Sequence, residues 1–187
     1  MYPSLSGLSK NKIAYFFDDD ISLYKYSDGH PMKPFRVKIT DTLIQKYGLG
    51  NHMDVFTQED ITIDDSYFTK FHSIDYVDVI KNVNPDNYEK YKDSLHMFGF
   101  SGDSPVFDGL YDYCWLSTGG SVLGASLLND RTHQTAINWG GGLHHAKRQE
   151  ASGFCYINDC VLSMYELLKK NERVLYIDID VHHGVSL

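Results

Sequence analysis

The residues best suited to chemistry stand near the end of the sequence, in the run Tyr-Ile-Asp-Ile-Asp-Val-His-His-Gly at 176–184. If this run is a β-strand, alternate side chains share a face, so Asp178, Asp180 and His182 point to one side. Two carboxylates and an imidazole are costly to bury without a partner, and a bound metal removes that cost. Aspartate and histidine are ligands that zinc accepts. The run therefore predicts a metal site, with a solvated strand end as the alternative.

A pair of histidines follows a glycine run in Gly-Gly-Gly-Leu-His-His at 140–145. Glycine permits the tight turns that would let His144 and His145 reach one pocket. Beside a zinc ion that acidifies a bound water, an imidazole can accept the proton that the water loses. A lone histidine is more often a structural or surface residue, but an adjacent pair after a glycine run favours a catalytic role.

These two motifs must be positioned by the elements around them. Apolar runs separated by breaker residues predict strands and helices in alternation. The expected strands are residues 12–17, 53–56, 135–139 and 173–180, and the expected helices are residues 35–47, 64–83, 107–128 and 158–170. Such alternation is typical of an α/β fold whose parallel sheet is covered by helices on both faces. Ligands then bind beyond the carboxyl ends of the strands, where both motifs lie.

The composition indicates one globular domain over residues 1–187. Apolar residues make up 42% of the sequence and charged residues 22%, which is the balance of a folded chain rather than a disordered one. No repeat or linker interrupts it. Aromatic residues make up 14%, which fits core packing or the walls of a tunnel. The Gly119-Gly120 pair is unfavourable for one uninterrupted helix over 107–128.

The formal net charge of −8 argues against direct binding to nucleic acid, which needs basic side chains to displace counterions. The same charge is compatible with a lysine-rich peptide as partner. Three cysteines without a CxxC motif fit a reducing intracellular compartment. The start of the sequence lacks the apolar core of a signal peptide, and no run approaches the roughly 18 apolar residues of a membrane span. We therefore expect an intracellular chain that binds neither nucleic acid nor membrane.

Beyond these patterns, the sequence resembles class I histone deacetylases. The resemblance is carried by motifs at residues 29–34, 105–110, 140–145, 151–156 and 178–184, and it runs from about residue 12 to residue 184. It implies a three-layer arginase/deacetylase-like fold with a central parallel sheet, of which this chain is expected to hold roughly the first half. It also implies zinc-dependent hydrolysis of N6-acetyl-lysine on histones, and hence a role in chromatin regulation and transcriptional repression.

The resemblance assigns roles to the residues of both motifs. Asp180 and His182 match two zinc ligands. His145 matches the general base and acid, and His144 matches its electrostatic partner. Asp178 matches the carboxylate that orients His144. The backbone carbonyls of Asp178, Asp180 and His182 match part of a site for a structural K⁺ ion.

Other matched positions would contact substrate or partners. Gly153 and Phe154 would line the tunnel for the acetyl-lysine stem. Asp103 matches the rim carboxylate that holds the substrate backbone; without the resemblance it would be a loop aspartate in a local turn. Gly29 and Lys33 resemble positions that contact an inositol phosphate where the family docks on corepressor proteins. The expected partners are acetylated histone tails or other acetyl-lysine proteins and a corepressor complex, in the nucleus, with the cytoplasm as a second compartment.

Two departures from the family pattern affect the expected activity. Val-Ser-Leu at 185–187 follows Gly184, where the family has Asp-Gly, so the aspartate that would steady His145 is absent. The family's third zinc ligand and the tyrosine that stabilises the oxyanion are expected only downstream of residue 187. Because a catalytic zinc site needs three protein ligands, we expect this chain to be an incomplete, inactive form.

Two other interpretations stay open. The chain could be a non-catalytic fragment that acts only through protein contacts. It could also be an arginase-like two-metal hydrolase, since those enzymes share the broad fold and an Asp-x-Asp-x-His motif. The His144-His145 pair and the Gly153-Phe154 dipeptide favour the deacetylase over the arginase-like hydrolase.

Overall fold

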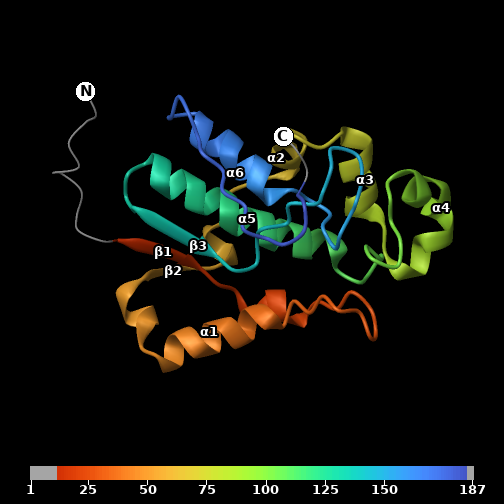
Figure 1. Ribbon diagram of the computed structural model, residues 1–187. Coiled ribbons are helices and arrows are strands. Elements are labelled where there is room, and N and C mark those ends of the chain that lie inside the picture. Colours follow the sequence, from red (N-terminus) through yellow and green to blue (C-terminus); the bar gives the residue numbers. More distant parts are fainter. Residues whose placement is uncertain (1–11, 185–187) are drawn as a thin grey trace.

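The computed structural model describes residues 12–184. Its sheet has three parallel strands, β1 (Ile13–Phe16), β2 (Asp54–Phe56) and β3 (Thr135–Asn138), in the order β2-β1-β3 (Figure 1). The first three expected strands and their parallel pairing are therefore confirmed. The start of the sequence, where a signal peptide was sought, and residues 185–187, where the family pattern breaks, lie outside the described residues.

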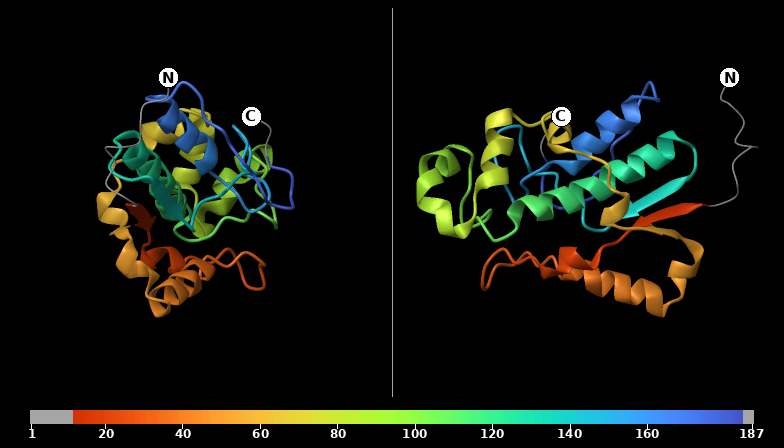
Figure 2. Two further views of the ribbon diagram at one scale, coloured as in Figure 1. Left: turned by 60° about the vertical axis from the view of Figure 1, so that its left-hand side comes forward. Right: turned by 180° about the vertical axis from the view of Figure 1, so that it is seen from behind.

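The two faces of the central strand carry different layers of helix. Tyr15 is fully buried, and its hydroxyl donates a hydrogen bond of 3.2 Å to Asp41 of α1 (Arg36–Lys46). On the other face lies α5 (Leu110–Asn129), with α6 (Asp159–Leu168) packed against it. Figures 1 and 2 show α1 on one side of the strands and α5 and α6 on the other. This is the three-layer α/β architecture that the sequence predicts.

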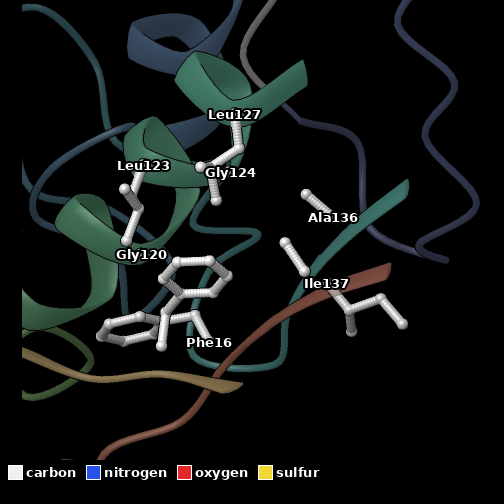
Figure 3. Close-up of a pocket in the computed structure, with 9 residues that line it drawn as sticks. Phe16, Gly120, Leu123, Gly124, Leu127, Ala136 and Ile137 are labelled. Atoms are coloured by element: carbon white, nitrogen blue, oxygen red, sulfur yellow. The ribbon is translucent and has the colours of Figure 1, made fainter. Parts of the chain in front are cut away.

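The glycines of α5 allow it to lie directly on the sheet. The helix runs without interruption through the Gly119-Gly120 pair, contrary to the expected weakness there. A Cβ atom at Gly120 would collide with the ring of Phe16, and one at Gly119 would collide with Ile61. A small hollow between this helix and the sheet has only apolar walls, including Phe16 and Leu123 (Figure 3). It offers no group that could do chemistry.

Of the remaining helices, α3 (Ile74–Asn82) and α4 (Tyr88–Met97) form one end of the molecule, whereas the short α2 (Asp65–Phe68) lies closer to α6 (Figure 1). Short 3-10 helices connect the elements along the chain: Asp19–Leu23 follows β1, Leu49–His52 follows α1, Gln58–Asp60 follows β2 and Pro85–Asn87 lies between α3 and α4. The expected single helix over 64–83 is therefore wrong, because Asp64 and Ser73 each cap a separate helix with their side chains. The sequence did not predict α4. Among residues 12–184, no helix is both long and apolar enough to cross a membrane.

The expected strand over 173–180 is absent. That segment forms no regular secondary structure and pairs with no strand in the described part of the chain. Ile177, Ile179 and Val181 are 72%, 95% and 91% exposed. A strand is stabilised by hydrogen bonds to a neighbour and by burial of one face, and an alternating sequence alone provides neither. Among residues 12–184, β3 is therefore an edge strand of the parallel sheet.

Many of the aromatic residues form the core next to the site loops. Tyr26 stacks on Phe107 at 4.8 Å between ring centroids and meets Tyr113 and Tyr156 at 5.7 Å each. All four side chains are buried. At these positions the packing interpretation of the aromatic content is the right one, and the cluster gives the site loops a rigid support.

Candidate active site

The first pair of the site joins two segments that lie far apart in the sequence. The Nδ1–H of His144 donates to Asp178 Oδ2 over 2.6 Å, and the imidazole is 8% exposed. Asp178 also accepts hydrogen bonds from the Tyr176 hydroxyl at 2.7 Å and from the Asp180 backbone at 3.0 Å. These hydrogen bonds, that of His144 first, hold the pKa of Asp178 well below its usual range. The carboxylate is therefore charged at neutral pH and keeps the proton of His144 on Nδ1.

His145 lies beside this pair with its own ring free to accept a proton. Its centroid is 4.1 Å from that of His144 and 5.9 Å from that of His182. Burial lowers the pKa of His145, and the neighbouring imidazoles lower it further. A neutral imidazole at neutral pH is the form that a general base requires.

The two expected zinc ligands lie next to each other and next to the histidine pair. Asp180 Oδ1 accepts hydrogen bonds from the backbone of His182 at 2.7 Å and from its Nδ1 at 2.9 Å. These bonds lower the pKa of Asp180. His144 Nε2 is 4.0 Å from the same carboxylate oxygen. Asp178, Asp180 and His182 thus gather at one place, although the segment that carries them is not a strand.

The residues present fit zinc in kind and fall short of it in number. A carboxylate and an imidazole are zinc donors, but a catalytic zinc site takes three protein ligands. Among residues 12–184, no three His, Cys, Asp or Glu side chains are grouped to hold a metal. Asp180 and His182 could therefore provide two of the ligands, and a third would have to come from outside the described residues.

Of the two expected tunnel residues, Gly153 lies directly against His145. Gly153 has a φ of +50°, and a Cβ atom there would lie 2.6 Å from Cδ2 of His145. Phe154 adopts a φ of +71°, a conformation that costs a non-glycine residue about 1–3 kcal/mol. The Tyr26 hydroxyl holds it there by donating to the Phe154 carbonyl over 2.6 Å. Strain of this kind gathers at functional sites, and here it occurs in the residue that follows Gly153.

His30 connects this loop to the expected rim residue, a role that the sequence interpretation missed. Its buried ring meets Phe154 edge-on at 4.9 Å, and Nε2 lies 3.3 Å from the carbonyl of Asp103. The Met32 backbone donates to Nδ1 over 3.0 Å, so Nε2 is the ring nitrogen that can donate to the Asp103 carbonyl. The sequence feature that could have indicated this role is the position of His30 between Gly29 and Pro31, inside one of the motifs that resemble the family. The side chain of Asp103 is exposed at the rim.

The positions expected to contact an inositol phosphate lie outside this cluster. Gly29 has a φ of +76° in the loop before α1, and Lys33 is exposed in the same loop. No ion pair among the described residues involves Lys33. The loop keeps both residues accessible.

Comparison with known proteins decides the family. The family model described as "Histone deacetylase domain" matches residues 30–185. The chain belongs to the histone deacetylase family. It is 52% identical over 176 residues to histone deacetylase HDAC1 of Drosophila melanogaster and 48% identical over 176 residues to histone deacetylase 1 of Homo sapiens. It is also 51% identical over 180 residues to histone deacetylase B of Dictyostelium discoideum.

These matches confirm the resemblance to class I histone deacetylases and the arginase/deacetylase-like fold. The matches to the Drosophila, human and Dictyostelium proteins cover 94%, 94% and 96% of this chain. They cover 33%, 36% and 42% of the relatives. The chain thus spans about a third to two fifths of the length of these curated relatives. The arginase-like interpretation is not supported, because the matching family is that of the deacetylases.

Proposed function

We propose that this chain provides one half of a zinc-dependent deacetylase site that hydrolyses N6-acetyl-lysine on histones or other proteins. The observation that carries the proposal is the His144–Asp178 hydrogen bond, with His145, Asp180 and His182 gathered next to it. A charged carboxylate, an oriented imidazole and a neutral imidazole beside two zinc donors form the set that metal-assisted amide hydrolysis needs.

The chain's own residues would divide the work as follows. When bound, zinc would lower the pKa of a water and polarise the acetyl carbonyl. His145 takes the proton from the attacking water and delivers it to the lysine nitrogen, so that water and amide become acetate and free amine. His144 stays hydrogen-bonded to Asp178 and stabilises the negative charge that develops nearby. Among the described residues, His145 thus carries both proton transfers, and His144 and Asp178 hold the charge and the orientation beside it.

Substrate selection would depend on the surface around this group. Gly153 and Phe154 present a backbone without a side chain and an aromatic ring, which suit the methylene stem of a lysine. The exposed carboxylate of Asp103 can accept hydrogen bonds from a peptide backbone, and the net charge of −8 favours a basic peptide. Acetylated histone tails have this chemistry. We place the protein in the nucleus on the same reasoning, with the cytoplasm as a second compartment.

Further ligands are part of the same proposal. The backbone carbonyls of Asp178, Asp180 and His182 would contribute to a K⁺ site. Gly29 and Lys33 would contact an inositol phosphate shared with a corepressor protein, since both residues are exposed in one loop.

The test is a chimera with a relative. Residues of the Drosophila deacetylase that align with this chain over 176 residues are replaced by those of this chain, and turnover of an acetyl-lysine peptide is measured. We expect zinc-dependent deacetylation that His145→Ala lowers by about 10²–10⁴-fold. His96→Ala, the same change at an exposed position of α4, should leave turnover unchanged. A folded chimera without turnover, or one indifferent to His145→Ala, would contradict the proposal.

The polypeptide of 187 residues should behave differently on its own. It holds two of the three ligands that the zinc site needs, so we expect no measurable turnover with added zinc. Turnover by this polypeptide would show that the two-ligand account is wrong. If the chimera also fails, the alternative of a chain that acts only through protein contacts gains support.

A further inference from the structure

A buried carboxylate lies under the glycine run that leads to the histidine pair. Asp159 is the first residue of α6 and is 2% exposed. Its Oδ1 accepts the backbone N–H of Leu143 at 2.7 Å, and its Oδ2 accepts that of Gly142 at 3.0 Å. The hydroxyl of Ser121 donates to Oδ2 over 2.6 Å. The strong partners of this carboxylate are therefore all donors, and two of them belong to the loop.

The glycine run is shaped around that carboxylate. A Cβ atom at Gly141 would collide with Oδ2 of Asp159 and with the hydroxyl of Ser121. Gly142 has a φ of +86°, which a side chain would oppose. Successive backbone N–H groups turned toward one anion are a known way to bind negative charge. Without such an anchor, three consecutive glycines would leave the loop free to move.

The residue before Asp159 holds the other side of the histidine pair. Asn158 donates from Nδ2 to the carbonyls of Ala146 at 3.0 Å and of His144 at 3.4 Å. Its own backbone N–H donates to Nε2 of the buried His72 over 3.0 Å. The start of α6 is therefore hydrogen-bonded to the loop on both sides of the histidine pair, through Asp159 before it and through Asn158 after it.

We propose that Asp159 is a positioning residue, which fixes the glycine loop and thereby the orientation of His144 toward Asp178. The catalytic meaning of this inference rests on the proposed function, whereas the structural claim does not. A carboxylate is costly to bury unless hydrogen bonds compensate for lost water, and the loop N–H groups provide them. The carboxylate and the loop thus order each other, and the ordered loop ends at the two imidazoles.

Asp159→Asn tests the proposal with little change of shape. Whichever way the amide is turned, its NH₂ group faces a backbone N–H, because Gly142 and Leu143 both donate. We expect the amide hydrogens of these two residues to exchange at least about tenfold faster. We also expect the NMR resonance of the proton between His144 and Asp178 to broaden or disappear. Both are measured on the whole polypeptide, without zinc or substrate, so failure of the proposed function would not affect them.

Glu166→Gln is the matched control. Glu166 is also on α6, is 7% exposed and loses the same charge, but it contacts Tyr67 and Lys169 rather than the loop. It should change the melting temperature while leaving the Gly142 exchange rate and the His144 resonance as they are. If Asp159→Asn does not fold, Ser121→Ala removes one donor and should still shift that resonance. An unchanged resonance and exchange rate in the Asp159→Asn variant, or in Ser121→Ala when the former cannot be measured, would overturn the proposal. Equal effects from Glu166→Gln would also overturn it.

Discussion

At the scale of single residues, the contacts of Asp178 and His145 determine which of these side chains is charged at neutral pH. Asp178 is ionised because His144, Tyr176 and a backbone N–H all donate to it. His145 is neutral at neutral pH because burial, and then the neighbouring imidazoles, lower its pKa. The two histidines can therefore take different roles although they are adjacent, and the difference comes from what each one contacts.

Replacing Asp178 should separate orientation from charge. Asp178→Asn offers an amide in place of the carboxylate, so His144 loses the charged acceptor that fixes its Nδ1 proton. In the chimera we expect turnover to fall by about 10²-fold or more while KM changes little. Asp75→Asn, at an exposed position of α3, is the control and should have no effect. Unchanged turnover in the Asp178 variant would remove this carboxylate from the mechanism.

At the scale of elements, the close approach of α5 to β1 determines where the site loops begin. The carboxyl ends of β1 and β3 lead into the segments that carry His30 and the glycine run. A shift of the helix would therefore move the network of Ser121 and Asp159.

Gly120→Ala should be destabilising although alanine is the better helix former. The added methyl would collide with Phe16, and overpacking of this kind costs about 1–3 kcal/mol, more than the roughly 1 kcal/mol of helix propensity it gains. Urea unfolding measures the difference. Gly102→Ala meets open space in its loop and should be close to neutral. Stabilisation by Gly120→Ala would contradict the packing described here.

Sequence patterns predicted most of these elements, and their failures have physical causes. Strand β1 and helices α1 and α6 follow from apolar periodicity and from breakers that act locally. The expected strand over 173–180 has the right alternation, but pairing depends on a neighbour that local sequence does not encode. Asp159 was missed because an aspartate at the start of a helix resembles an ordinary first-turn residue. Its partners, Ser121 and the glycine run, come from distant parts of the chain.

At the scale of the whole molecule, stability should depend on pH through a buried histidine. Burial lowers the pKa of His72 to about 4, while in the unfolded chain it would be near the ordinary value of about 6.5. Between these values the unfolded state binds a proton that the folded state does not, so stability falls as the pH falls. The free energy of unfolding should drop by about 2 kcal/mol from pH 7 to pH 5 through this group alone. Urea unfolding at pH 7 and at pH 5 measures this drop in the wild-type chain and in His72→Gln. The drop should be smaller by about 2 kcal/mol in the variant. An equal drop in both proteins would show that another group causes it.

The exposed apolar side chains near the end of the described chain should favour self-association. Leu175, Ile177 and Ile179 are 83%, 72% and 95% exposed, and the outer side of β3 carries no further strand among residues 12–184. Sedimentation velocity of the polypeptide should show larger species as concentration rises. The double variant Ile177→Lys, Ile179→Lys should sediment closer to a monomer at the same concentration. Equal sedimentation of the two proteins would show that these side chains do not cause the association.

The proposed activity requires that Asp180 and His182 bind one zinc ion beside the histidine pair. Zinc titration of the 187-residue polypeptide against a chromophoric chelator tests this directly. We expect one weakly bound zinc, with affinity reduced by more than about tenfold in Asp180→Ala and in His182→Ala. His183→Ala should leave the affinity unchanged, since among residues 12–184 the ring of His183 hydrogen-bonds to the Gly184 carbonyl and not to Asp180 or His182. Zinc binding that is indifferent to both Asp180 and His182 would contradict the account.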